Sequence, residues 1–201
     1  SNLKKIDKLP SIFLANEFFD AIPIKQFLKY KNSWFEKFVN IDTKKKLSFI
    51  KRKVNIKVVE KKVNFKISEK QNFIEYSPLG IKYLIDIFKI IRGNDGGLLI
   101  IDYGYFSEKM QDTLQAIHKK KFSKILKNIG KSDITYNINF YIIKKIVKNF
   151  KELDVNFTSQ KKFLYNLGIK ERAEIISKNK AFTEKIDLFY RLKRLTHKKE
   201  M

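Results

Sequence analysis

Carboxylates and an amide follow the ends of two apolar runs in this sequence. The first run begins at Ser11 and ends in Asn16, Glu17 and Asp20. The second run ends in Asp102. If both runs are parallel strands, their carboxyl ends meet at one edge of a sheet, and ligands of such sheets bind beyond that edge. The pattern therefore predicts a ligand site lined by acidic side chains.

A structural explanation for the same acids is also open. A carboxylate that follows a strand can simply cap neighbouring backbone N–H groups. For Glu17, Asp20 or Asp102 taken singly, the sequence does not decide between capping and ligand binding. Two acid-tipped strands in one unit favour the ligand site.

The elements that must position these acids form a strand–helix–strand unit. The run from Ser11 is apolar on both faces, which predicts a buried strand of a parallel sheet covered by helices. Ser77 and Pro78 predict the start of a helix over 77–92, which Gly93 ends. A second strand follows over 98–102. We expect a right-handed βαβ unit.

Residues 24–76 show a different pattern, in which short apolar segments alternate with period two. This alternation is typical of an antiparallel meander with one solvent-facing, lysine-rich face. Segments 54–58 and 63–67 are expected to be strands of it. We expect the meander to be a lobe inserted beside the parallel sheet.

The rest of the chain is mostly expected to be helical. Residues 107–126 fit a helix weakly, and a ligand-side loop is the alternative. The other expected elements are a helix capped by Asn137 or Asn139 with a core stripe from Phe140 to Phe150, a strand over 154–159, helices over 161–166 and 170–178, and a last helix capped by Thr183. The last helix is expected to turn Ile186, Phe189 or Tyr190, Leu192 and Leu195 inward.

The strong positive charge of the chain has two explanations. The 201 residues include 44 Lys and Arg against 21 Asp and Glu, for a formal charge of +23, but only five of the 44 are arginines. Base readout favours arginine, and lysine occurs here with the Ile, Asn and Phe of A+T-rich codons. The alternative is a non-enzymatic basic module that binds RNA or an acidic protein partner on the 24–76 lobe, where Tyr30, Trp34 and Phe35 could stack on bases.

Composition also limits the chemistry. The chain has no cysteine, so disulfides, thiolate catalysis and zinc–thiolate clusters are excluded. His118 and His197 lie among lysines without an acid at motif spacing, so we interpret both as solvated and expect no metal site. No apolar run reaches the roughly 20 residues of a membrane helix. We expect a soluble, intracellular protein.

An ordered set of motifs resembles the MidA-like class I methyltransferases over nearly the whole chain. The motifs are Ala15–Pro23, Trp34–Glu36, Glu75–Pro78, Leu99–Gly104, Asp112–Ala116, Asp133–Thr135 and Leu167–Ile169 with Glu171–Glu174. Each motif is weak alone, but their order is specific. The implied fold class is α/β, the C-terminal half of a Rossmann-like class I methyltransferase fold with an inserted antiparallel meander.

The resemblance implies an S-adenosylmethionine-dependent protein arginine methyltransferase, whose mitochondrial relative methylates a core subunit of respiratory complex I. It implies one partial domain over 1–201, with 24–76 inserted. None of the seven glycines makes a Gly-x-Gly loop between a strand and a helix. The cofactor-loop half and the final strand are therefore expected outside this chain, and the fragment alone is expected to be inactive. The expected location is the cytoplasm of a bacterium or the mitochondrial matrix of a eukaryote.

The resemblance also implies roles for individual residues. Carboxylates can hold the forked donors of a guanidinium bidentately, and we assign that role, with catalysis, to Glu17 and Asp20. Asn16 is expected to reach the cofactor. The remaining substrate-binding residues are expected to be Asp102, Tyr103 and Gly104 on the opposite wall and Pro23 at the loop exit. Relatives have histidine where this chain has Lys120, and histidine and aspartate where it has Asn137 and Asn139, which implies a different affinity or specificity.

Overall fold

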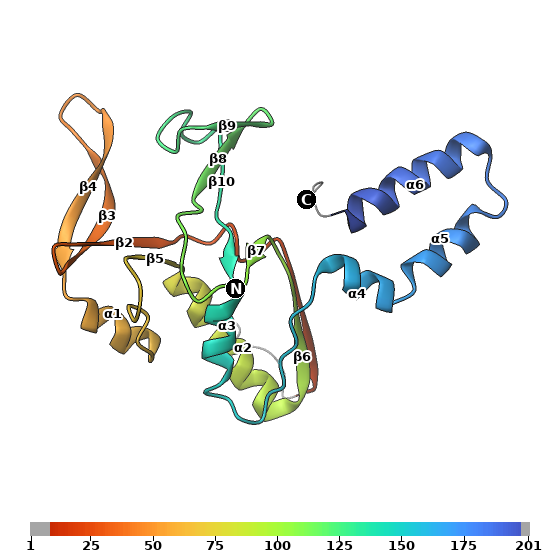
Figure 1. Ribbon diagram of the computed structural model, residues 1–201, viewed down its shortest axis with the longest axis horizontal. Helices are drawn as coiled ribbons and strands as arrows, with labels where there is room; N and C mark the ends of the chain where they lie inside the picture. Colours follow the sequence, from red (N-terminus) through yellow and green to blue (C-terminus); the bar gives the residue numbers. More distant parts are fainter. Residues whose placement is uncertain (1–8, 198–201) are drawn as a thin grey trace. The chain divides into compact units, whose positions relative to one another are not determined.

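The computed structural model describes residues 9–197. The chain divides into two compact units, the first ending at Asp154 and the second beginning at Val155. Figure 1 shows the elements of each unit. The sequence-based expectation of a single domain with an insertion stays a prediction.

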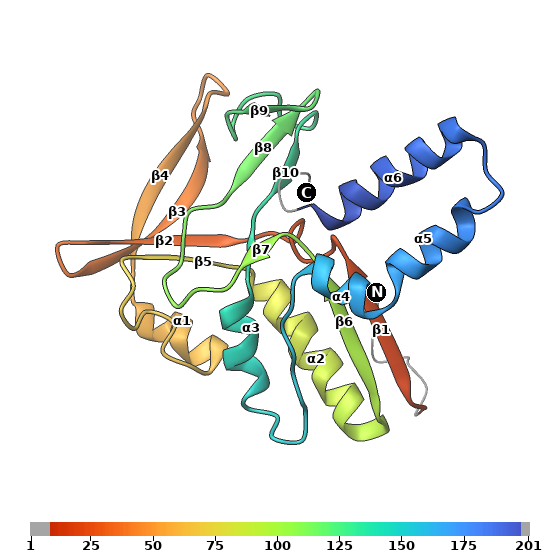
Figure 2. The same cartoon turned by 45° about the vertical axis from the view of Figure 1, so that its right-hand side comes forward.

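The predicted strand–helix–strand unit is confirmed. Strand β1 spans Ser11–Asn16, helix α2 spans Pro78–Asn94 and strand β6 spans Gly96–Ile101. Gly93 was expected to end the helix but lies within it, and Asp95 is the C-cap. β1 and β6 pair in parallel, so both strands end at the same edge. Ser77 caps α2, because its Oγ accepts a hydrogen bond from the Gly80 N–H at 2.9 Å. Helix α2 runs along β6 (Figure 2).

The prediction that β1 is buried on both faces is wrong for the described residues. Ala15 packs against the hydrophobic core together with Leu98 and Ile100 of β6. On the other face, Ile12 is 80% exposed and Leu14 is 75% exposed. Side chains alternate across a strand, and α2 covers only one of the two faces.

Residues 25–76 form a four-stranded antiparallel sheet and one helix. The sheet has the order β4-β3-β2-β5, with β2 at Lys25–Tyr30, β3 at Ser33–Ile41, β4 at Leu47–Val54 and β5 at Phe73–Tyr76. The expected strands over 54–58 and 63–67 are wrong, because helix α1 occupies Ile56–Val63. Its apolar residues Ile56, Val59 and Val63 recur at helical spacing. Asn55 caps its start, and Asn64 ends it in the left-handed conformation.

Residues 104–139 contain short strands, and the weakly predicted helix over 107–126 is absent. The strands are β7 at Gly104–Tyr105, β8 at Gln115–His118, β9 at Lys121–Ser123, β10 at Asp133–Thr135 and β11 at Ile138–Asn139. β10, β8 and β9 form an antiparallel sheet, and β7 pairs with β11 in parallel. Lys119 and Lys120 both have positive φ, as a two-residue hairpin turn requires.

Helix α3, at Phe140–Val147, contributes the predicted core stripe. Its cap is Asn139 and not Asn137, because the Asn139 Oδ1 accepts from the Tyr141 N–H at 3.0 Å. The Asn139 side-chain amide also donates to the Ser107 carbonyl oxygen at 3.0 Å. Ile142, Ile143, Ile146 and Val147 are buried. They join Phe27, Ile74 and Leu84 in one hydrophobic core.

The described part of the second unit, residues 155–197, contains three helices. They are α4 at Gln160–Asn166, α5 at Ile169–Ser177 and α6 at Phe182–Thr196. These helices were predicted, but the strand over 154–159 is wrong, since no described strand pairs with those residues. The N-cap of α6 is Ala181 rather than Thr183. Its predicted inward residues include Phe189 and Tyr190, which are 62% and 61% exposed, because so small a unit buries little surface.

Substitution of Gly104 tests how tightly β7 packs against β11. A Cβ at Gly104 would overlap the Ile138 carbonyl oxygen and the Phe140 ring. We therefore expect Gly104→Ala to lower the free energy of unfolding by about 1–3 kcal/mol, as overpacking does. Gly97 has open space around its Cβ position, so Gly97→Ala is the matched control and should change stability by less than about 0.5 kcal/mol. Denaturant unfolding followed by circular dichroism measures both, and equal effects would contradict the packing argument.

Candidate functional site

The loop that leaves β1 begins beside the end of β6. Asn16 lies opposite Ile101 in the parallel register, and the Glu17 N–H donates to the Ile101 carbonyl oxygen at 2.9 Å. Asp102 follows Ile101 directly. The structure therefore brings Glu17, Asp20 and Asp102 to one edge, and we call these three carboxylates the acidic rim.

Asp102 fixes the backbone of the loop. Its Oδ2 accepts from the Phe19 N–H at 2.9 Å and from the Asp20 N–H at 3.4 Å. Its Oδ1 accepts from the Tyr103 N–H at 2.9 Å. Burial, and then the charge of Asp20, raises the pKa of Asp102 to about 6. Asp102 thus acts on the described backbone, as the capping alternative expects, while it positions the other two acids.

Glu17 presents its carboxylate to solvent from a constrained backbone. Its φ is +46°, a conformation that non-glycine residues adopt rarely and at a cost of about 1 kcal/mol or more. The Tyr103 hydroxyl donates to the Glu17 Oε1 at 3.4 Å. Burial and the charge of Glu17 raise the pKa of Tyr103, so this phenol stays protonated near neutral pH.

Asp20 is the most enclosed of the three acids. The residue is 6% exposed, and its carbonyl oxygen accepts from the Tyr136 N–H at 3.1 Å. Burial raises the pKa of the Asp20 carboxyl, and the charges of Glu17 and Asp133 raise it further. The side chain therefore lies in a negative, partly desolvated environment.

The acidic rim lacks counter-charges within residues 9–197. No Lys or Arg of this range forms a salt bridge with Glu17, Asp20 or Asp102. In a chain of charge +23, three clustered carboxylates without a lysine partner are unexpected. A bound cation would supply the missing charge.

The other predicted site residues lie around the rim with different environments. Asn16 is exposed at the end of β1. The Pro23 carbonyl oxygen accepts from the Ser77 Oγ at 2.9 Å, which ties the exit of the loop to the start of α2. Gly104 lies against Ile138 with no room for a side chain. None of these contacts tests whether the three residues bind a ligand.

A second polar cluster surrounds Glu75, and the site prediction missed it. The Glu75 Oε2 accepts from the Gln26 amide at 2.6 Å, and the Oε1 accepts from the Thr113 N–H at 3.2 Å. The Gln26 amide also donates to the Asp112 Oδ1 at 2.8 Å. Burial raises the pKa of Glu75, which is 4% exposed. The signal available in the sequence was a carboxylate inside the apolar run that ends at Tyr76.

Members of both groups of acids influence Tyr136. The residue is 8% exposed, and burial raises the pKa of its phenol far above the ordinary value. The charges of Asp102, Glu75 and Asp20 raise this pKa further. The acidic rim and the Glu75 cluster therefore act electrostatically on one buried tyrosine.

Within residues 9–197, no group of three or more His, Asp or Glu side chains is placed to hold a metal ion. His118 bonds through Nδ1 to the Lys131 carbonyl oxygen at 2.9 Å. The same residues include no helix long and apolar enough to cross a bilayer. A cation with several N–H donors would complement these carboxylates, and a guanidinium fits that description.

The aromatic residues proposed for RNA stacking are not arranged for it. Trp34 is 7% exposed and belongs to the hydrophobic core, and Phe35 is only partly exposed. Tyr30 is 63% exposed. Base stacking uses successive exposed rings. The structure therefore gives no support to the non-enzymatic RNA-binding alternative.

Comparison with known sequences points to methyl transfer. Residues 1–158 match a protein family described as "putative S-adenosyl-L-methionine-dependent methyltransferase". The chain is 30% identical over 174 residues to a mitochondrial protein named as a homolog of protein arginine methyltransferase NDUFAF7 from Caenorhabditis elegans, and 27% identical over 177 residues to NDUFAF7 of Rattus norvegicus. These matches cover 84% and 87% of this chain but 41% and 39% of the relatives. The chain spans about two fifths of their length.

A solved structure shares the fold. It is a "likely methyl transferase" from Burkholderia thailandensis bound to S-adenosyl-homocysteine, with a TM-score of 0.78 at 20% identity. The match covers 98% of this chain and 53% of that one. A native structure of the same superfamily from that organism gives a TM-score of 0.79 at 19% identity. The predicted α/β fold class, Rossmann-like with an antiparallel meander, is confirmed.

The raised pKa of Asp102 predicts a pH-dependent contribution to stability. The protonated form is favoured in the folded state, so this contribution is complete below about pH 3.8 and is lost as the pH rises through about 6. Asp102→Asn cannot titrate there. We expect the Tm difference, wild type minus variant, to fall between about pH 4 and pH 7 in thermal unfolding at matched ionic strength. A difference that stays constant with pH would contradict the buried, charge-coupled state of Asp102.

Proposed function

The chain belongs to this family of S-adenosyl-L-methionine-dependent methyltransferases, as its motifs predicted, and we propose that it forms the substrate side of a protein arginine methyltransferase. The acidic rim is the observation that supports arginine as the substrate. Its three carboxylates follow the ends of two parallel strands and form no salt bridge with a described Lys or Arg. Curated relatives carry the name protein arginine methyltransferase. Because the chain spans about two fifths of those relatives, the activity of the whole protein is part of the proposal.

Each acid has a distinct part in this proposal. Burial and then the charge of Glu17 raise the pKa of Asp20, and a guanidinium beside it would relieve the repulsion from Glu17. Glu17 is exposed, so its carboxylate can accept hydrogen bonds from the edge of the guanidinium that Asp20 leaves free. It can also accept the proton that the arginine nitrogen loses on methylation. Asp102 is a positioning residue, since its oxygens hold the backbone N–H groups of Phe19 and Asp20.

The described residues could hold one part of the cofactor, namely its sulfonium end. S-adenosylmethionine, when bound, supplies a methyl group on a positively charged sulfonium, and a negative rim suits that charge. Asn16, exposed at the end of β1, would hold it from this side. No described glycine lies in a loop from a strand into a helix that could cradle its remaining polar groups. We propose that a glycine-rich loop outside these residues supplies that part.

The resemblance to this family also suggests which protein is methylated and where. We propose that the methylated partner is a protein with an accessible arginine, and that a subunit of respiratory complex I is the target. The curated relatives are mitochondrial proteins. A eukaryotic source would place the reaction in the mitochondrial matrix, and a bacterial source would place it in the cytoplasm.

Removing the charge of Glu17 or of Asp20 should abolish methyl transfer without unfolding the protein. We expect Glu17→Gln and Asp20→Asn to lower kcat/KM by about 100-fold or more, because a lost charge-assisted contact weakens guanidinium binding and proton removal. The assay follows labelled methyl groups from S-adenosylmethionine to arginine. It uses the protein with its glycine-rich cofactor loop, as longer natural sequence or joined from a relative.

The control for both variants is Asp95→Asn. Asp95 is exposed at the opposite end of β6, and Asn has nearly the same shape at its positive φ, so the same loss of charge should leave transfer and Tm unchanged. If Glu17→Gln or Asp20→Asn melts early and retains turnover, that residue is structural and the proposal fails for it.

A further inference from the structure

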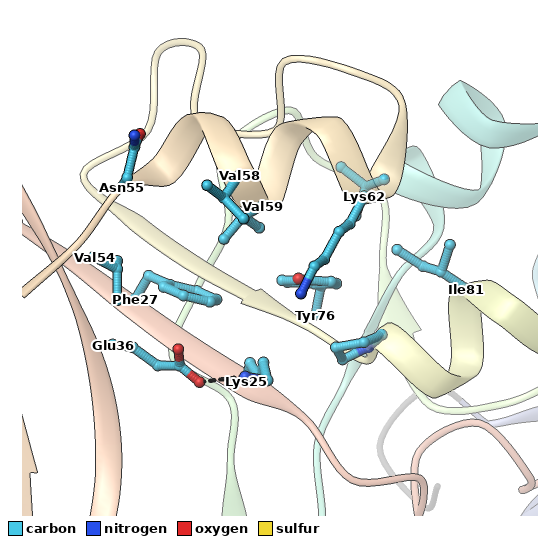
Figure 3. Close-up of a pocket in the computed structure, with 12 residues that line it drawn as sticks. Lys25, Phe27, Glu36, Val54, Asn55, Val58, Val59, Lys62, Tyr76 and Ile81 are labelled. Atoms are coloured by element: carbon cyan, nitrogen blue, oxygen red, sulfur yellow. Dashed lines mark hydrogen bonds and ion pairs between the residues drawn. The ribbon is translucent and has the colours of Figure 1, made fainter. Parts of the chain in front are cut away.

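A cavity of about 500 Å³ lies in the antiparallel region, between helix α1 and the sheet (Figure 3). Apolar side chains from both sides line it, namely Phe27, Val54, Val58, Val59, Val63 and Ile81. Val58 is 52% exposed and Phe27 is 1% exposed, so the cavity reaches from the surface to the core. Its volume is within the range of ligand pockets.

The polar groups of the cavity leave one positive charge. The Lys25 Nζ and the Glu36 Oε1 form an ion pair at 2.6 Å, so these two charges cancel. Burial and the charge of Glu36 raise the pKa of Tyr76 to about 12, which keeps its phenol neutral. Lys62 lines the cavity from the last turn of α1, and no described acid forms a salt bridge with it. The cavity therefore suits an apolar group beside a negative charge.

The cavity lies close to the acidic rim along the chain. Lys25 pairs with Tyr76 in the sheet register, and both line the cavity together with Pro78. Ser77, between the last two, donates to the Pro23 carbonyl oxygen at the exit of the rim loop. Five residues from Asp20 to Lys25 can span at most about 18 Å. A peptide of about five residues is therefore long enough to reach from the rim to the Lys25 edge of the cavity.

The surroundings of the cavity have the opposite charge to the rim. Residues 24–76 contain fifteen Lys and Arg against five Asp and Glu. A guanidinium suits the rim, whereas carboxylates suit this region. The two surfaces together describe a substrate with both charges and an apolar side chain between them.

We propose that the cavity binds an apolar side chain of the protein substrate, flanked by acidic residues, within about five residues of the arginine that the rim holds. This inference rests on the proposed function, because it takes the rim as the arginine site. Phe27 and Tyr76, the aromatic side chains of the lining, belong to the core and offer no exposed face to a nucleic-acid base. We therefore propose a protein segment, and not RNA, as the occupant.

The test is binding of fluorescent peptides to the full chain, measured by anisotropy. The probe carries one arginine, a phenylalanine four residues away and aspartates beside the phenylalanine. We expect replacement of that phenylalanine by alanine to weaken binding about tenfold, since an apolar anchor in a pocket dominates such contacts. Lys62→Glu should weaken it by a similar factor, and Val58→Phe, which fills the exposed mouth, should do the same without disturbing the core.

Lys61→Glu is the matched control. Lys61 precedes Lys62 on the same helix, is exposed and does not line the cavity. It should change the affinity less than about twofold. Equal weakening by Lys61→Glu and Lys62→Glu, competition by single-stranded RNA, or equal affinity for the alanine peptide would overturn the cavity site.

The binding readout is separate from catalysis. Pocket-specific binding supports the cavity, and if the protein with its glycine-rich cofactor loop then transfers no methyl group to arginine, the proposed reaction is contradicted while the cavity stands. Arginine methylation with identical KM in wild type and Lys62→Glu supports the reaction and contradicts the cavity. The two proposals therefore fail in distinguishable ways.

Discussion

The hydrogen bonds of Asp102 are the interaction on which the candidate site depends. One carboxylate accepts backbone N–H groups from both sides of the edge, from Phe19 and Asp20 after β1 and from Tyr103 after β6. Parallel pairing brings the two strand ends together, but it does not fix the loop beyond them. Asp102 does so, and the loop then holds Asp20 in an enclosed place and Glu17 at positive φ. The cost is a carboxylate whose burial raises its pKa to about 6.

The acidic rim is an exception to the strongly basic charge of the chain. A chain with 44 Lys and Arg could neutralise every surface carboxylate, yet the described lysines leave the acidic rim unpaired. Glu17 repels Asp20, and Asp20 repels Asp102; backbone N–H groups offset part of this repulsion, but no described Lys or Arg forms a salt bridge with these acids. Sites commonly keep such unfavourable charge where a ligand of opposite charge binds. The antiparallel region over residues 24–76 is basic by contrast, with fifteen Lys and Arg against five Asp and Glu.

The sequence predicted the elements whose local signals agreed. The apolar runs, the Ser77–Pro78 cap and the glycines around β6 all indicated one strand–helix–strand unit, and the acids at its edge followed from topology. Helix α1 was missed because Val54, Ile56 and Val58 also fit a period of two. The exposure of Ile12 and Leu14 depends on which faces other elements cover, which periodicity does not encode. The contact of Glu75 with Thr113 joins positions 38 residues apart through a loop without periodicity, so only the fold reveals it.

Arginine binding at the rim is tested most directly by a nuclear magnetic resonance titration of the chain with N-acetyl-arginine amide. The same titration with N-acetyl-lysine amide is the comparison. Guanidinium binding at the rim predicts shifts of the Phe19, Asp20 and Tyr103 amides, larger for arginine than for lysine and lost in Asp20→Asn. Shifts that are equal for the two amino acids, lie elsewhere or persist in Asp20→Asn would contradict the rim as an arginine site.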